Sequence, residues 1–117
     1  MTKSPIATKI SPTNLDEDKT LANRLKALGH PVRLEIISRL TTLCEPCCGD
    51  VCDCLPLAQS TVSQHLEILR KAGLIISRQS GNRSCFSIDQ SAFESVSSAL
   101  NALGAPRELG QSPTLDN

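Results

Sequence analysis

The stretch that most strongly decides the fold is QSTVSQHLEILRKA, residues 59–72. Its apolar side chains recur at spacings of four and three and predict one buried helix face: Val62, Leu66 and Leu69. Gly73 follows directly, as is typical of a helix C-terminus. The opposite face is mainly short and polar and carries Ser60, Gln64 and Lys71, flanked by Thr61, Ser63, Glu67 and Ile68. The sequence therefore predicts an amphipathic helix with one face available to a partner.

This polar face has the properties of a helix that lies in the major groove of DNA. An α-helix fits the groove, and short side chains let its backbone approach the base edges. Gln64 is the best candidate for a base contact, because a carboxamide pairs bidentately with adenine. His65 lies at the edge of the apolar face, so a packed or phosphate-facing histidine is favoured over one that contacts a base. The alternative is a solvated helix face on a small helical domain.

Two β-prone segments, residues 74–79 and 83–88, flank Ser80-Gly81-Asn82 and predict a hairpin. Arg78 and Arg83 lie on either side of its Gly-Asn tip, where they can follow the DNA backbone or the minor groove. The candidate DNA-contacting residues are Ser60, Thr61, Ser63, Gln64, His65, Lys71, Arg78, Asn82 and Arg83.

Three further segments have the apolar period of amphipathic helices. The first two carry Leu21, Leu25 and Leu28, and then Val32, Ile36, Leu40 and Leu43. The last carries Phe93, Val96, Leu100 and Leu103. A short helix over residues 50–55, ended by Pro56, is expected between the second segment and residues 59–72. The predicted fold is therefore mainly α with a small β-hairpin, in the order α-α-α-α-β-β-α.

The chain of 117 residues has room for one domain. We expect flexible tails over residues 1–14 and 104–117, where Pro, Gly, Ser and Thr occur without a helical or strand period, and a folded domain over residues 15–103. That domain has two Phe and no Trp or Tyr, so its core is small. Dimerisation is a natural way to bury the missing apolar area.

Composition also limits the classes of partner. No apolar run approaches the ~20 residues of a membrane span, and no secretory leader is visible, so the protein is predicted to be cytoplasmic. The formal net charge is +0. Residues 60–85 nevertheless hold four cations, Arg70, Lys71, Arg78 and Arg83, against the single acid Glu67. A locally basic segment fits weak attraction to DNA, with specificity supplied by groove contacts.

Five of the six cysteines lie within residues 44–54, here termed the cysteine segment: Cys44, Cys47, Cys48, Cys52 and Cys54. In reducing cytosol this density indicates metal or redox chemistry rather than a disulfide framework. Thiolates are soft donors and select soft ions. Trivalent arsenic and antimony are thiophilic and bind three sulfurs. The candidate metal ligands are Cys44, Cys47, Cys48 and Cys52, with Cys54 in reserve, whereas Cys85 is interpreted as a small buried hydrophobe.

Two stretches resemble the ArsR (ArsR/SmtB) family of metal-sensing repressors, and within that family they resemble its arsenic-responsive members. They are ALGHPVRLEIISRL, residues 27–40, and LPLAQSTVSQHLEILRKAGLI, residues 55–75. With the hairpin, the resemblance covers about residues 19–103. It implies a winged helix-turn-helix, a homodimer joined through the first and last helices, and repression at operator DNA that an inducer relieves.

The resemblance also bears on the cysteines. Arsenic-responsive members share a Cys-x-Cys-Asp motif at the start of the third helix, and Cys47-Cys-Gly-Asp50 aligns with it. Cys47 matches the first thiol and Gly49 occupies the second, so Cys48 would substitute from the neighbouring position. The third ligand is then Cys44 or Cys52.

The leading hypothesis is a repressor released from its operator by arsenite or antimonite. A structural zinc site, or zinc or cadmium sensing, is the first alternative, because five cysteines can supply four thiolates. A thiol redox sensor is the second. The Cys44-Glu-Pro-Cys47 spacing is found in disulfide oxidoreductases, but the βαβ context of such enzymes is missing, so the protein is predicted not to be an enzyme.

Overall fold

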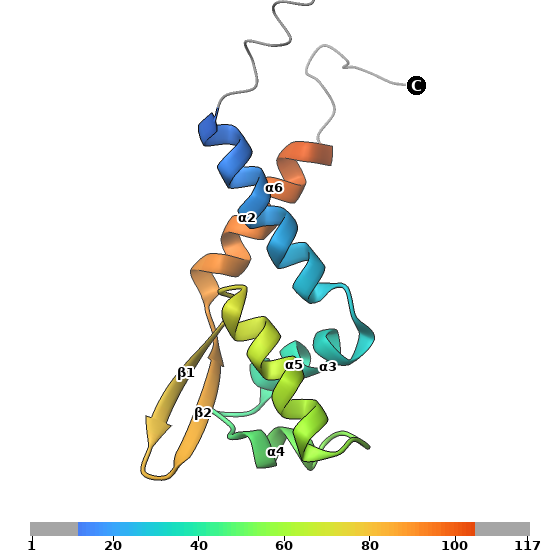
Figure 1. Ribbon diagram of the computed structural model, residues 1–117, viewed down its shortest axis with the longest axis vertical. Coiled ribbons are helices and arrows are strands. Elements are labelled where there is room, and N and C mark those ends of the chain that lie inside the picture. The colour runs from blue at the N-terminus through green and yellow to red at the C-terminus, as the bar shows by residue number, and fades with distance from the viewer. Residues whose placement is uncertain (1–11, 105–117) are drawn as a thin grey trace, which may run out of the picture.

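The computed structural model describes residues 12–104, which form five helices and one hairpin (Figure 1). In chain order the elements are α2 (Pro12–Leu28), α3 (Pro31–Thr42), α4 (Cys48–Cys52), α5 (Gln59–Lys71), β1 (Ile75–Ser80), β2 (Arg83–Ile88) and α6 (Gln90–Gly104). The predicted order α-α-α-α-β-β-α is confirmed within these residues.

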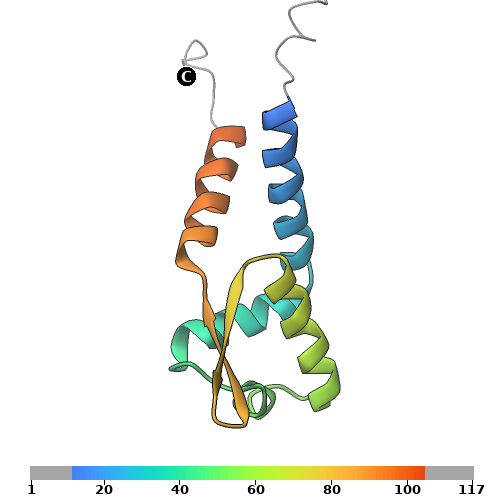
Figure 2. The same ribbon diagram turned by 60° about the vertical axis from the view of Figure 1, so that its left-hand side comes forward.

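Two helices from opposite ends of the described chain lie next to each other. α2 and α6 contact one another and project together from the rest of the molecule (Figures 1 and 2). The remaining helices and the hairpin form a compact unit below them, and the hairpin tip points away from the projecting ends of α2 and α6. The molecule is therefore divided into a two-helix arm and a unit that carries α4, α5 and the hairpin.

The core of this unit is built on the apolar face of α5. Val62, Leu66 and Leu69 are almost completely buried, which confirms the face predicted from their spacing. They belong to one cluster with Ile36 of α3 and Val51 of α4, both with no exposed surface. Burial of such side chains contributes about 1.5–3 kcal/mol each, so the position of α5 is fixed by packing rather than by its polar face.

The C-terminal turn of α5 is tied to α2. Gly73 has a φ of +80°, the left-handed conformation that ends many helices and suits glycine. Arg24 of α2 donates from Nε to the carbonyl oxygen of Ala72 at 3.3 Å. This contact holds α5 against the arm at the point where the chain turns into β1.

The hairpin is antiparallel, with a register that runs from Ile75 opposite Ile88 to Ser80 opposite Arg83. Its two-residue turn places Gly81 at φ +65°, as tight hairpin turns require. The cysteine segment adds a short third pairing at the free edge of β2. Cys47 forms an isolated antiparallel bridge with Cys85, and the Phe86 N–H donates to the Pro46 carbonyl oxygen at 2.9 Å.

The short helix α4 differs most from its prediction. It spans Cys48–Cys52 rather than residues 50–55. Its start is fixed by a capping box in which the Cys47 N–H donates to the Asp50 carboxylate at 3.0 Å. This box draws Cys48 and Gly49 into the helix despite the glycine.

Smaller differences occur elsewhere. α2 begins at Pro12, a residue favoured in a first helical turn, three residues before the expected start of the folded domain. The rest of the predicted tails, residues 1–11 and 105–117, lies outside the described residues. In α6, Val96 is buried as predicted, but Leu100 and Leu103 are 44% and 72% exposed. No helix within residues 12–104 is long and apolar enough to cross a membrane.

Candidate DNA-contacting surface and cysteine cluster

Most of the predicted DNA-contacting side chains are free to meet a partner. Ser60, Ser63 and Gln64 are exposed on α5, and Asn82 is exposed at the hairpin tip. Thr61 is half-buried beside them. The helix therefore presents a short polar face that is supported from behind by the core.

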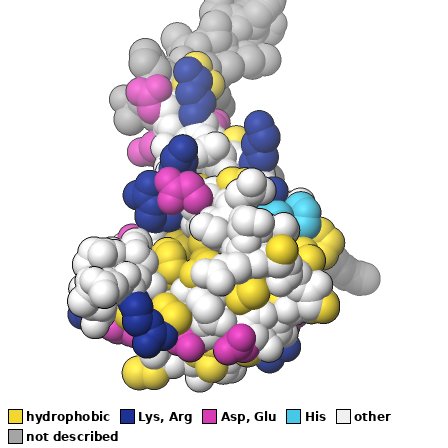
Figure 3. Space-filling view, turned by 60° about the horizontal axis from the view of Figure 1, so that its bottom comes forward, with side chains coloured by type: hydrophobic (Ala, Val, Ile, Leu, Met, Phe, Trp, Pro, Cys, Tyr) yellow, Lys and Arg dark blue, Asp and Glu magenta, His cyan; other side chains and the backbone are white. Residues whose placement is uncertain are grey.

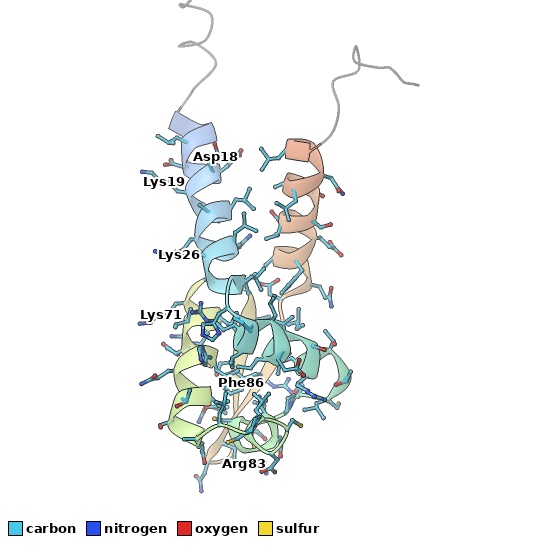
Figure 4. The ribbon with its side chains drawn as sticks, turned by 90° about the vertical axis from the view of Figure 1, so that its right-hand side faces the viewer. Asp18, Lys19, Lys26, Lys71, Arg83 and Phe86 are labelled. Carbon is cyan, nitrogen blue, oxygen red and sulfur yellow. The ribbon has the colours of Figure 1, made fainter. Side chains whose placement is uncertain are left out.

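Charge on this surface is divided into small groups. Arg70 donates from Nε and Nη2 to the Glu67 carboxylate at 2.9 and 2.6 Å, which neutralises it locally. Lys71 projects on the same side as Lys26, at the end of the unit opposite to Arg83 (Figure 4). In Figure 3, Lys and Arg side chains are scattered, and acidic groups lie beside several of them. Any electrostatic attraction of this surface to DNA would therefore be weak, and groove contacts would have to supply the specificity.

His65 is placed differently from the other predicted DNA contacts. It is half-buried, and its Nδ1 accepts a hydrogen bond from Arg33 Nε at 3.3 Å. Its ring lies 4.6 Å from that of His30, which caps α3 by accepting the Val32 N–H at 3.1 Å. Burial, followed by the charges of His30 and Arg33, lowers the pKa of His65. His65 thus joins α5 to α3.

Both hairpin arginines predicted to contact DNA are bound to the cysteine segment or its helix. Arg78 forms an ion pair with Glu45. Arg83 donates from Nη2 to the Cys47 sulfur at 2.6 Å, and the same nitrogen lies 3.6 Å from the Asp50 carboxylate. The cysteine segment, with the candidate metal ligands, is therefore in direct contact with the hairpin, which carries candidate DNA contacts.

Cys47 is the centre of this contact. It is 9% exposed, precedes α4 as its N-cap and lies opposite Cys85 of β2. Hydrogen bonds from the backbone and side chain of Cys47, and then the Arg83 charge, lower the pKa of Asp50. The hydrogen bond to Cys47 raises the pKa of Arg83, and so do the negative charges of Cys47, of Asp50 and, least, of Cys85.

Two further thiols reach the start of the helix expected to contact DNA. The Cys52 thiol donates to the Leu57 carbonyl oxygen at 3.3 Å, and the Cys48 thiol faces the Gln59 carbonyl oxygen at 4.0 Å. Burial, followed by the charges of Cys52 and then Cys47, raises the pKa of Cys48.

The remaining cysteines are placed less centrally. Cys44 and Cys54 are exposed, and the Cys54 thiol faces the Asp50 carbonyl oxygen at 3.6 Å. Cys85, interpreted from the sequence as a small buried hydrophobe, is half-buried. Within residues 12–104, no three His, Cys, Asp or Glu side chains already converge in a way that could hold a metal ion. The donor chemistry fits a soft ion, whereas a common coordination point requires the sulfurs to move.

A cleft of about 530 Å³ lies where α4, α5 and the hairpin tip meet. Its lining includes candidate metal ligands and candidate DNA contacts alike: Cys47, Cys48, Ser63, Asn82 and Arg83.

Known proteins with similar sequences identify the family. Residues 30–77 match the family described as "Bacterial regulatory protein, arsR family". The regulator YgaV of Escherichia coli (strain K12) is 33% identical over 82 residues, which are 70% of this chain and 83% of that protein. The chain belongs to the ArsR family. It is thus a transcriptional repressor with a winged helix-turn-helix, and the ArsR-family relatives are regulators rather than enzymes.

Two other similar proteins add detail to the ArsR assignment. The arsenical resistance operon repressor of Escherichia coli (strain K12) is 39% identical over 56 residues, which are 48% of each chain, so about half of that repressor is matched. The homodimeric winged helix-turn-helix DNA-binding domain Mb0332 of Mycobacterium bovis has a TM-score of 0.65 at 26% identity, covering 88% of this chain and 94% of that one.

In this ArsR-family repressor the sequence did not predict which groups join the cysteine segment to the hairpin. Glu45, Asp50 and Cys85 were absent from the predicted DNA and metal sites. Only Asp50 left a local signal, because an acidic residue three positions after an N-cap is typical of a capping box. The other contacts join residues 33 or more positions apart.

Proposed function

We propose that this repressor binds operator DNA as a homodimer and leaves it when trivalent arsenic or antimony binds to Cys47, Cys48 and Cys52. The carrying observation is that all three thiols belong to one short helix: Cys47 is the N-cap of α4, and Cys48 and Cys52 lie four positions apart on it, a spacing that places them on one face. Three thiols without a histidine suit a thiophilic ion that takes three sulfurs. The E. coli arsenical resistance repressor supports an arsenical inducer by its name.

Each of the three sulfurs lies beside the hairpin, the start of α5 or the loop that leads into α5. Cys47 accepts from Arg83 at the start of β2, whereas Cys48 and Cys52 face the carbonyls of Gln59 and Leu57. Coordination would withdraw the sulfurs from these partners. Because the sulfurs do not converge in this conformation, the ion would bind a rearranged segment more tightly, and such differential binding is what releases DNA.

The homodimer is proposed from the two-helix arm. α2 and α6 leave Leu15, Leu100 and Leu103 exposed, and the M. bovis relative is homodimeric. A second copy against this arm would place two α5 helices on one DNA face. In helix-turn-helix dimers such helices are separated by about 34 Å, one turn of DNA, so a small rotation of α5 would weaken binding.

The test is a fluorescence-anisotropy titration of the reduced protein on the promoter of its own operon. We expect arsenite and antimonite to raise the operator Kd roughly 10- to 100-fold, a coupling of about 1.4–2.8 kcal/mol. Zinc, cadmium and peroxide are titrated in parallel. Release by zinc or cadmium alone would instead indicate a four-thiolate site that includes Cys44. Release by peroxide alone would identify a redox sensor without a metalloid inducer.

Gln64→Ala is expected to weaken operator binding by about 1–3 kcal/mol, roughly 5- to 150-fold in Kd, because a bidentate base contact is lost. Gln64 is exposed on the polar face of α5 and supports no core residue, so stability should change little. The measurement is Kd on operator and on unrelated DNA. Gln90→Ala, an exposed glutamine at the start of α6, is the matched control and should retain the original Kd. An equal loss on both DNAs would argue against base recognition by Gln64.

A further inference from the structure

The bridge between the cysteine segment and the hairpin brings together two thiols from distant parts of the chain. Cys47 and Cys85 face each other in an antiparallel bridge, and both are free. The hydrogen bond from Phe86 N–H to the Pro46 carbonyl flanks this pair. That pattern defines a non-hydrogen-bonded pair, in which Cα atoms are typically about 4.5 Å apart and the side chains lie close together. Such a separation falls within the range of about 4.4–6.8 Å that a disulfide spans.

The surroundings of Cys47 favour reaction there. Arg83 donates from Nη2 to the Cys47 sulfur at 2.6 Å, and a hydrogen bond from a cation stabilises negative charge on the atom that accepts it. Cys85 lies two residues after Arg83 on the same strand face and is half-buried, within reach of a small oxidant. The bridge lies in the α4, α5 and hairpin unit, away from the free ends of the α2 and α6 arm.

We infer that Cys47 and Cys85 form a redox pair that a hydroperoxide closes into a cross-strand disulfide. The Cys47 thiolate attacks the O–O bond of hydrogen peroxide and becomes a sulfenic acid, while the leaving hydroxide takes a proton and departs as water. The Cys85 thiol then attacks the sulfenic sulfur, and a second water leaves. In total, two thiols and one peroxide give one disulfide and two waters, and a small thiol reverses the reaction.

This disulfide would link the hairpin covalently to the start of α4. It would also remove the Cys47 sulfur from any soft ion. Peroxide oxidation and metalloid binding would therefore exclude each other, a consequence that rests on the proposed function. The disulfide itself does not depend on that function, since it needs only the two opposed thiols.

The primary test uses the full-length reduced protein and hydrogen peroxide at one equivalent per chain. We expect the number of free thiols to fall from the six in the sequence to four. After trypsin digestion, residues 40–70 should be linked to residues 84–107, and tandem mass spectrometry should assign the bond to Cys47 and Cys85. A disulfide confined to residues 44–54, a bond from Cys85 to another cysteine, or no disulfide would overturn the inference.

Variants separate the redox pair from the metalloid site. Cys85→Ser should lose the peroxide-induced link and keep arsenite-driven DNA release, whereas Cys54→Ser should keep both. Loss of arsenite release in Cys85→Ser would make Cys85 an ion ligand and contradict its assignment as the resolving thiol. When arsenite is bound before peroxide is added, the rate of formation of the Cys47–Cys85 disulfide should fall at least tenfold. If arsenite does not bind, the disulfide still forms without it, so failure of one proposal is distinguishable from failure of the other.

Discussion

Cys47→Ser is expected to abolish the 10- to 100-fold loss of operator affinity that arsenite causes in the unmodified protein. A serine hydroxyl is a hard oxygen donor and does not replace a thiolate on a soft ion. It still accepts a hydrogen bond from Arg83 and fits the N-cap of α4, where serine is favoured. Without arsenite, the operator Kd of the variant should therefore stay within about threefold of that of the unmodified protein. The two proteins should differ only in their response to arsenite.

The measurement is the operator Kd with and without arsenite, paired with arsenite binding measured by thiolate-to-arsenic ultraviolet absorption. Cys48→Ser and Cys52→Ser should behave like Cys47→Ser. Cys54→Ser is the matched control, because Cys54 is exposed and lies beyond the end of α4. Cys44→Ser should also respond normally. Full release in Cys47→Ser, or its loss in Cys44→Ser, would show that the proposed ligand trio is incorrect.

The fold follows from local patterns to a large extent. The spacing of Val62, Leu66 and Leu69 predicts the buried face of α5 because helix geometry alone decides which side chains share a face. The hairpin is predicted for a similar reason, since Gly81-Asn82 suits a two-residue turn. Helix α4 was misplaced because a cysteine is not a usual N-cap residue, so its capping box had only Asp50 as a visible member.

The site was predicted less completely, because its decisive contacts are long-range. No local pattern indicates that Arg83 reaches the Cys47 sulfur, 36 positions earlier in the chain. The spacing of Cys48 and Cys52 does predict a shared helix face, and both lie half-buried on α4. Their approach to the Leu57 and Gln59 carbonyls depends on how α4 packs against α5, which the sequence does not specify.

Two leucines that belong to the apolar period of α6 are exposed in the single chain. Leu100 and Leu103 continue the period of Phe93 and Val96, yet no element covers them fully within residues 12–104. Exposed leucines in register with a buried face are typical of a surface that a second copy covers. The hydrophobic period was therefore detected correctly, and part of it is better explained by assembly than by the core of one protomer.

The double variant Leu100→Asp with Leu103→Asp is expected to be monomeric and to lose at least about 100-fold in operator affinity. Two carboxylates at a dimer contact would be desolvated without partners. The free-energy cost of this desolvation exceeds the stabilisation that a small dimer interface contributes. A monomer holds one α5 helix on one half-site and loses the gain from linked binding, which is commonly 10²- to 10⁴-fold. Because both side chains are exposed in the protomer, the fold itself should persist, as circular dichroism would check.

Light scattering measures the molar mass of the double variant in solution, and fluorescence anisotropy measures its Kd on a full operator and on a single half-site. Ile76→Asp is the control for oligomeric state: Ile76 is 49% exposed, close to the 44% of Leu100, but lies on β1 rather than on the arm. It should remain dimeric. The double variant at Leu100 and Leu103 should also bind a half-site and a full operator with nearly equal affinity, because each of its protomers acts alone. A dimeric mass with operator affinity unchanged would place the interface away from α6 and would require a different spacing of the two α5 helices.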